Sequence, residues 1–232
     1  WLKDKYGCKM IAFAADVGQG AGELDGIEEK ALASGADKCV VADLRKEFAE
    51  QYCFKLLAVG AVYEHVYLLG TSIARPLIAK AQVDCALKER ADAVAHGATG
   101  KGNDQVRFEV TQMALAPQLK TIAPLREWEL LTRDDEVDYA TAHGIPIPVT
   151  KEKPYSIDQN IWGCAIEAGE MEDLWTEPPL DCWRMTADPA HAPKGSVELV
   201  IRFEQGIPVA IDDRPMGGVE LIRYLNELAG TF

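Results

Sequence analysis

Through the first 150 residues, short apolar runs alternate with longer segments of helical periodicity, and this alternation limits the possible folds more than any other feature. The apolar runs predict strands at residues 9–15, 38–41, 91–95 and 119–123. Strands that alternate with helices are typical of a parallel sheet whose faces are covered by the helices. We therefore expect an α/β fold in this part of the chain.

The segments between these strands predict helices at residues 27–34, 43–57 and 72–89. Asp43 is predicted to cap its helix, because the carboxylate can accept the free N–H groups of a first turn. Residues 132–135 (TRDD) resemble a capping box, and the helix that follows should stop at Gly144, before Pro146.

The alternation ends at a polar linker that contains a proline, residues 151–154. Beyond the linker, the apolar segments 197–203 and 208–211 flank the sequence EQGI, which favours a β-hairpin. The boundary near residue 150 predicts two domains, residues 1–150 and 151–232.

The richest stretch in polar chemistry is residues 95–109, AHGATGKGNDQVRFE, between a predicted strand and a predicted helix. Its glycines let the backbone approach a ligand, and a helix N-terminus favours an anion. Asn103, Asp104 and Arg107 can reach one site from a first helical turn, with Lys101 just before them. This set suits a zwitterionic amino acid beside a nucleotide. The alternative is a strand-to-helix turn with a solvated polar end.

The glycine-containing segments of the chain do not match the common nucleotide-binding and hydrolase motifs. Residues 97–102 lack the spacing and the Ser/Thr of a Walker A loop, and Gly18, Gly20 and Gly22 do not match the dinucleotide motif. Residues 70–74 (GTSIA) do not form the G-x-S-x-G of a hydrolase. The residues alone therefore indicate a nucleotide-type α/β domain with an unfamiliar loop.

Further segments, together with HGATGKGNDQVRFE, resemble the argininosuccinate synthase family in order and spacing: MIAFAADVGQ at 10–19, YLLGTSIARP at 67–76, APLREWE at 123–129 and GIPIPVTKEKPYSIDQN at 144–160. The resemblance covers nearly all of the 232 residues. It implies a parallel-sheet nucleotide-binding domain of the ATP-pyrophosphatase, adenine nucleotide α-hydrolase-like type. Part of an α+β synthetase domain, which binds citrulline and aspartate and forms oligomers, would follow it.

The family is a carbon–nitrogen ligase of arginine biosynthesis that joins L-citrulline to L-aspartate and releases AMP and pyrophosphate through a citrulline adenylate. The resemblance implies ATP as a substrate with Mg²⁺ beside it, a cytoplasmic location and a homotetramer. ATP itself activates this chemistry, so we assign no catalytic side chain. The alternatives are another adenylating ligase of the same fold, or a non-catalytic relative that binds an amino acid or a nucleotide.

The resemblance also implies binding residues. They are Ala15 and Gly97 for ATP; Thr99, Asn103 and Asp104 for aspartate; and Tyr67, Ser72, Asn103, Arg107 and Ser156 for citrulline. Taken singly, Tyr67 could be a half-buried aromatic, Ser72 a helix N-cap and Ser156 a loop serine. His96 is interpreted as structural.

The chain also departs from the family pattern. Ala165 stands where the family often has a second citrulline-binding serine. The pyrophosphate loop SGGLDTS would precede Trp1, and further citrulline-site residues and the oligomerisation helix would follow Phe232. We therefore expect a fragment that is inactive alone.

Composition narrows the remaining possibilities. A net charge of −13 argues against a nucleic-acid surface. No apolar run approaches the roughly 20 residues that cross a bilayer, so no membrane contact is expected. The six cysteines contain no C-x-x-C pair and are interpreted as reduced, buried packing residues of a cytosolic protein. The four histidines show no metal-ligand spacing, so no metal site built from protein ligands is expected.

Overall fold

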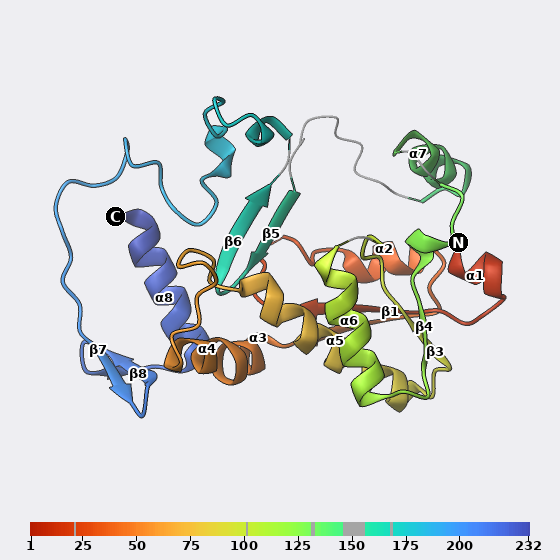
Figure 1. Cartoon of the computed structure of the whole chain (residues 1–232), viewed down its shortest axis with the longest axis horizontal. Helices are drawn as coiled ribbons and strands as arrows, with labels where there is room; N and C mark the ends of the chain where they lie inside the picture. The colour runs from red at the N-terminus through yellow and green to blue at the C-terminus, as the bar shows by residue number, and fades with distance from the viewer. Residues whose placement is uncertain (21, 101, 131–132, 146–155, 168) are drawn as a thin grey trace. The chain divides into compact units, whose positions relative to one another are not determined.

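The computed structural model describes residues 1–20, 22–100, 102–130, 133–145, 156–167 and 169–232 (Figure 1). The chain forms two compact units that interleave along the sequence. The first comprises Trp1–Asp16, Ala21–Asp43 and Arg75–Val149, and the second comprises Val17–Gly20, Leu44–Ala74 and Thr150–Phe232. The sequence predicts consecutive domains instead, and its boundary near residue 150 stays a prediction.

The first unit contains two pairs of parallel strands. β1 (Ile11–Asp16) pairs with β2 (Lys38–Asp43) along its whole length, and β3 (Ala93–Ala95) pairs with β4 (Lys120–Ile122). Each predicted strand is confirmed, with ends that shift by at most two residues. The parallel direction confirms the α/β fold that the alternation predicts.

The helical segments of the first unit are α1 (Leu2–Tyr6), α2 (Ile27–Ala33), most of α5 (Gly70–Glu89), α6 (Asn103–Leu115), the 3₁₀ turn η2 (Pro124–Arg126) and α7 (Arg133–Ala142). Of these, α1 precedes β1, α2, α5 and α6 lie between successive strands in the sequence, and η2 and α7 follow β4 (Figure 1). The predicted stop after α7 is confirmed, because Gly144 has a φ of +64° and leaves the helical conformation. Thr132 and Pro146 of the predicted end signals lie outside the described residues.

A chain of polar side chains fixes α5 and α6 to the second strand pair. Gln82 on α5 donates its side-chain amide to the Ala95 carbonyl at 2.8 Å. Gln112 on α6, which is 1% exposed, donates to Gln82 at 2.7 Å and accepts from the Thr121 hydroxyl at 3.2 Å. A buried side-chain amide without a hydrogen-bond partner lowers the stability of the fold. This series of hydrogen bonds therefore holds the two helices in one register against β3 and β4.

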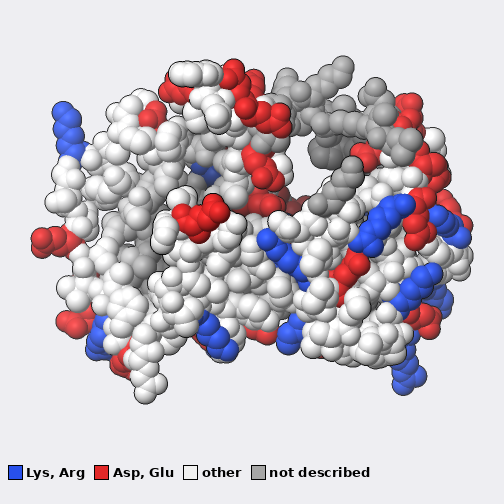
Figure 2. All heavy atoms as spheres, viewed as in Figure 1, with Lys and Arg blue, Asp and Glu red and all other residues white. Residues whose placement is uncertain are grey.

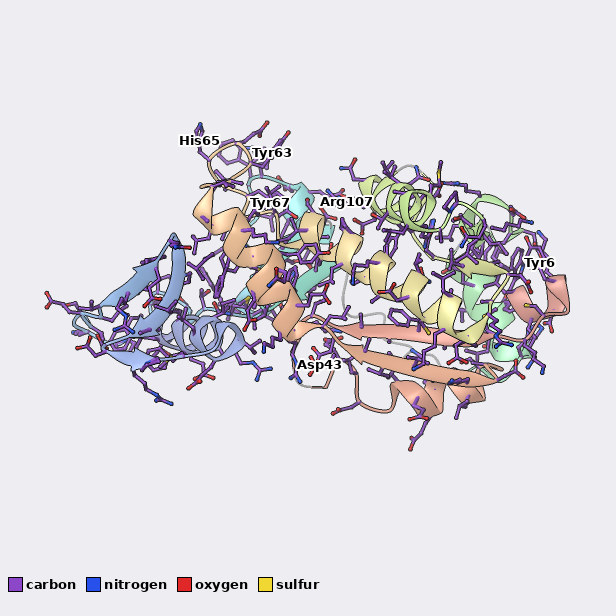
Figure 3. The ribbon with its side chains drawn as sticks, turned by 90° about the horizontal axis from the view of Figure 1, so that it is seen from below. Tyr6, Asp43, Tyr63, His65, Tyr67 and Arg107 are labelled. Carbon is purple, nitrogen blue, oxygen red and sulfur yellow. The ribbon has the colours of Figure 1, made fainter. Side chains whose placement is uncertain are left out.

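The predicted cap at Asp43 is wrong. Asp43 pairs with Asp16 as the last residue of β2, Leu44 occupies the N-cap, and the helix begins at Arg45. Figure 3 shows Asp43 at the end of its strand. The pairing of β2 with β1 extends two residues further than predicted, to Asp43. The backbone of Asp43 therefore belongs to the strand and not to the start of the helix.

The helix predicted to residue 57 is present with a wider middle. It consists of α3 (Arg45–Glu47), the π-helix η1 (Phe48–Cys53) and α4 (Phe54–Ala58). This segment contributes buried side chains to the core of the second unit: Phe48 is fully buried, and Phe54 is 3% exposed. It packs against the last helix, α8 (Gly218–Thr231), and α4 also contacts β8 (Ile207–Ile211).

The rest of the second unit is antiparallel. β7 (Ile201–Glu204), β8 and β9 (Arg214–Pro215) form one sheet, and β5 (Ser156–Asn160) pairs with β6 (Gly163–Glu167). The predicted hairpin is confirmed: Gln205 and Gly206 have φ values of +52° and +82°, as the tight turn between β7 and β8 requires. Two 3₁₀ turns, η3 (Gly169–Glu172) and η4 (Leu180–Cys182), complete the unit.

Two segments of the second unit meet closely at Gly18. The Ile161 N–H donates to the Val17 carbonyl at 3.0 Å. Gly18 has a φ of +84°, and a Cβ there would lie 2.7 Å from the Cβ of Ile161. Glycine is therefore required at this position both by the backbone dihedral and by the space.

All six cysteines are free thiols, but only Cys53 is buried and the others are partly exposed. The expectation of buried packing cysteines is therefore right for Cys53 alone. Burial raises the pKa of the Cys53 thiol to about 12, so it stays protonated and unreactive.

Both signs of charge occur on the face shown in Figure 2. Within the described part of the chain, none of the helices combines the length and the apolar character that crossing a membrane demands.

Candidate functional site

The predicted strand–loop–helix arrangement around the glycines is confirmed. β3 ends at Ala95, and α6 begins at Asn103 after an N-cap glycine, Gly102, in extended conformation. A Cβ on Gly102 would lie 3.1 Å from the Thr99 hydroxyl, whereas one on Gly97 would meet nothing within 4 Å. Neither the fold nor a left-handed dihedral demands glycine at Gly97, so its missing side chain leaves the backbone open to a ligand.

Asp104 lies between two guanidinium groups. Arg75 on α5 donates its Nε to one carboxylate oxygen at 2.8 Å, and Arg107 donates to the other at 2.7 Å. The three side chains are between 23% and 30% exposed, so the cluster is partly shielded from water but still reachable. Sequence reasoning missed Arg75 as a site residue, although it lies in the YLLGTSIARP motif.

The other predicted residues of the loop lie near this cluster in the sequence but make fewer contacts. Thr99 is exposed in the middle of the loop, and Asn103 is exposed at the first position of α6. Ala15 lies in β1, opposite Ala42. Lys101 lies outside the described residues.

Tyr67 and Ser72 meet at the start of α5. The Ser72 hydroxyl donates to the Tyr67 phenol oxygen at 3.5 Å. Burial raises the pKa of Tyr67, but hydrogen bonds from Thr71 and Ser72, side chains and backbone, outweigh it and bring the pKa below 10.0. The phenol oxygen of Tyr67 therefore accepts hydrogen bonds from the first turn of this helix. Ser72 lies inside that turn, two residues after the helix begins at Gly70, so the interpretation of Ser72 as an N-cap is wrong.

Ser156 and Ala165 lie on the β5–β6 hairpin. Ser156 is exposed, and its backbone pairs with Glu167. Ala165 pairs with Asp158 and is also exposed. Of the predicted residues, the structure thus brings Asp104 together with Arg107 in the first unit, and Tyr67 together with Ser72 in the second.

A group of three polar side chains lies beside the loop, with His96 buried and Glu109 and Arg126 partly exposed. The His96 side chain, 3% exposed, faces the Glu109 carboxylate at 3.1 Å, and Arg126 approaches the same carboxylate oxygen at 2.5 Å. Burial raises the pKa of Glu109, but the bonds from Arg126 and His96 outweigh it and hold the pKa below its ordinary value of 4.5. Glu109 is therefore an anion at neutral pH.

This pKa gives a testable acid dependence. A carboxyl whose pKa is lower in the folded state stabilises the fold above the unfolded-state pKa, and the contribution is lost as the pH falls through the folded-state value. We expect the free energy of unfolding to drop below about pH 4.5, and Glu109→Gln to remove part of that drop. Urea unfolding across this range measures it. An unchanged slope in the variant would contradict the ionic role of Glu109.

Two family models match the chain. The model described as "Arginosuccinate synthase N-terminal HUP domain" matches residues 1–146. The model described as "Arginosuccinate synthase C-terminal domain" matches residues 155–232.

Curated proteins named argininosuccinate synthase are similar over almost the whole chain. The protein from Pelotomaculum thermopropionicum is 54% identical over 230 residues, 99% of this chain and 57% of its own length. Those from Aliivibrio salmonicida and Moorella thermoacetica are 53% and 54% identical, over 98% and 100% of this chain and 56% of their own lengths. The chain therefore spans little more than half the length of these relatives.

Proposed function

Because the chain belongs to the argininosuccinate synthase family, we propose that the whole protein joins L-citrulline to L-aspartate at the expense of ATP. The observation that supports this most is the Asp104 cluster beside the glycine-rich loop. Its carboxylate can receive an ammonium group, and its guanidinium groups can receive a carboxylate, as recognition of amino acids requires.

The proposed reaction has two steps. The ureido oxygen of citrulline attacks the α-phosphorus of ATP, the bond to the β-phosphate oxygen breaks, and pyrophosphate leaves with its electron pair. The amine of aspartate then attacks the ureido carbon of the adenylate. The carbon–oxygen bond breaks, AMP leaves with that oxygen, and the amine loses its proton to water. Both steps depend mainly on holding the reactants in line.

We assign the predicted residues to the three substrates. Asp104 would hold the aspartate ammonium, and Arg107 would hold citrulline from the same turn of α6. Gly97 would face the nucleotide, where its backbone is open. The full set is Ala15 and Gly97 for ATP; Thr99, Asn103 and Asp104 for aspartate; and Tyr67, Ser72, Asn103, Arg107 and Ser156 for citrulline.

We propose that Mg²⁺ arrives with the phosphates of ATP, which is its usual mode of binding in phosphate sites. Among the residues whose positions are described, no three His, Cys, Asp or Glu side chains gather to form a cage for the ion. We assign the metal no protein ligand.

We also propose that the whole protein is a cytoplasmic homotetramer, as the family resemblance implies. Light scattering of the whole protein after size exclusion gives its mass directly. A monomer would contradict the assembly and leave the ligase proposal standing.

Isotope transfer tests the reaction. The whole protein is supplied with ATP, aspartate and citrulline labelled with ¹⁸O in the ureido group, and AMP is analysed by mass spectrometry. We expect one ¹⁸O atom in each AMP, with one pyrophosphate released per argininosuccinate. Hydrolysis of ATP without citrulline dependence would favour another adenylating ligase, and binding without turnover would favour a non-catalytic relative.

Arg107→Lys tests the citrulline assignment. Lysine keeps the charge but not the rigid donor fork, so we expect the citrulline KM to rise about 10-fold while the aspartate KM changes little. Steady-state kinetics measure both constants, and a melting curve is recorded beside them. A loss of thermal stability with an unchanged citrulline KM would mean that Arg107 serves only as the ion-pair partner of Asp104.

A further inference from the structure

His96 is the most deeply buried ionisable side chain beside the loop, and no role in binding is assigned to it. Its backbone N–H continues the β3–β4 ladder by donating to the Ile122 carbonyl at 3.2 Å. Its ring stacks on Phe108 of α6, with centroids 5.7 Å apart and planes at 19°. The side chain therefore turns back from the strand end and lies between the loop and α6.

The partners of the two ring nitrogens determine the protonation state of His96. Nδ1 accepts a hydrogen bond from the backbone N–H of Ala98 at 3.3 Å, so it carries no proton. Nε2 lies 3.1 Å from a carboxylate oxygen of Glu109, which can only accept. Only the neutral ring with its proton on Nε2 satisfies both contacts.

The same network reaches the loop a second time. Arg126 contacts both Glu109 and the side-chain oxygen of Gln105, and Gln105 donates its amide to the Gly100 carbonyl at 2.9 Å. The loop is thus held at the Ala98 N–H through His96 and at the Gly100 carbonyl through Gln105. Both paths converge on Arg126, and Gly97 lies just before the first attachment point.

We propose that His96 is a positioning residue for ATP: as the neutral Nε2–H ring, it ties the Ala98 N–H to Glu109 and Arg126 and thereby sets the backbone at Gly97 that meets the nucleotide. This inference rests on the proposed function, because the nucleotide role of Gly97 is part of it. It adds a residue that acts on ATP affinity without touching the ligand.

Two substitutions separate the attachments of the ring. In His96→Gln the amide can replace Nε2 toward Glu109, but nothing accepts from Ala98. In His96→Asn the side-chain oxygen can replace Nδ1 toward Ala98, and the bond to Glu109 is lost. Calorimetric titration of the whole protein with ATP should show the Kd rise about 3- to 10-fold for His96→Gln, the loss of one hydrogen bond, and rise less for His96→Asn.

Val83→Ala is the stability control, because Val83 is an apolar side chain of α5, 1% exposed, that forms none of the hydrogen bonds and ion pairs described above. It should lower the melting temperature and leave the ATP Kd unchanged. An unchanged Kd in His96→Gln would overturn the proposal, as would equal rises in both histidine variants that follow only their melting temperatures.

Measurements on the unaltered protein keep the inference testable if a histidine variant fails to fold. Ring-nitrogen NMR shifts should show the proton on Nε2, and hydrogen exchange should show a protected Ala98 amide. A proton on Nδ1 or a rapidly exchanging Ala98 amide would overturn the inference. If ATP binds and these results hold but no argininosuccinate forms, the proposed function fails and the positioning role stands.

Discussion

Asp104→Ala in the whole protein should raise the aspartate KM about 10- to 150-fold, because a charge-assisted hydrogen bond contributes about 1.5–3 kcal/mol. The carboxylate is the group that we assign to the substrate ammonium, and Arg75 and Arg107 hold one oxygen each. Removal of the carboxylate leaves the first step intact, since aspartate reacts only after the adenylate forms. Steady-state kinetics with aspartate varied give the constant.

Exchange of labelled pyrophosphate into ATP is the control for Asp104→Ala, because it requires citrulline but no aspartate. We expect this exchange to stay within about threefold of the unaltered protein, a difference below 1 kcal/mol. Asp104→Asn separates charge from shape, since it keeps the size of the side chain and loses the anion. An equal collapse of exchange and of overall turnover would show that Asp104 does not serve aspartate.

Gly18→Ala should lower the free energy of unfolding by about 2–5 kcal/mol. A left-handed dihedral costs an L-residue about 1–2 kcal/mol, and an overpacked contact costs about 1–3 kcal/mol more. Gly18 has a φ of +84°, and the new Cβ would lie 2.7 Å from the Cβ and 3.1 Å from the backbone nitrogen of Ile161. Neither atom belongs to the end of a flexible side chain, so the backbone must move. Urea unfolding measures the loss.

Gly206→Ala is the matched variant for Gly18→Ala. Gly206 has a φ of +82° in the same unit, and its Cβ would meet Ala58 at ordinary distances, 3.4 Å from the Cβ and 3.8 Å from the Cα. It should therefore cost the dihedral strain alone, about 1–2 kcal/mol. Equal losses in the two variants would mean that the approach of Ile161 adds nothing.

Local patterns predict much of this fold because the interactions that they report are local. The apolar runs at β1 to β4 and the hairpin turn at Gln205 and Gly206 are set by neighbouring residues. Asp43 shows the limit of this reasoning. Its type suits a cap, but the pairing of β1 with β2 extends to it and moves the helix start to Arg45.

In the candidate site, too, contacts within one helix could be predicted from the sequence, and contacts between elements could not. The closeness of Asp104 and Arg107 follows from their spacing on one helix. Arg75 reaches Asp104 only because α5 packs beside α6, and no spacing in the sequence encodes that contact. The bond from Ala98 to His96 likewise depends on a side chain that folds back over its own loop. Contacts between elements depend on how the elements pack, which local sequence patterns do not determine.

The ion pair between Asp104 and Arg107 has a consequence for how the binding of one amino-acid substrate affects the binding of the other. With the proposed assignments, the pair joins the aspartate subsite to the citrulline subsite. Citrulline bound to Arg107 would draw the guanidinium from Asp104 and leave that oxygen for the aspartate ammonium. Thermodynamic linkage makes the effect mutual, so each amino acid would strengthen the binding of the other by the same factor. Cooperativity between the substrates would then arise within a single turn of one helix.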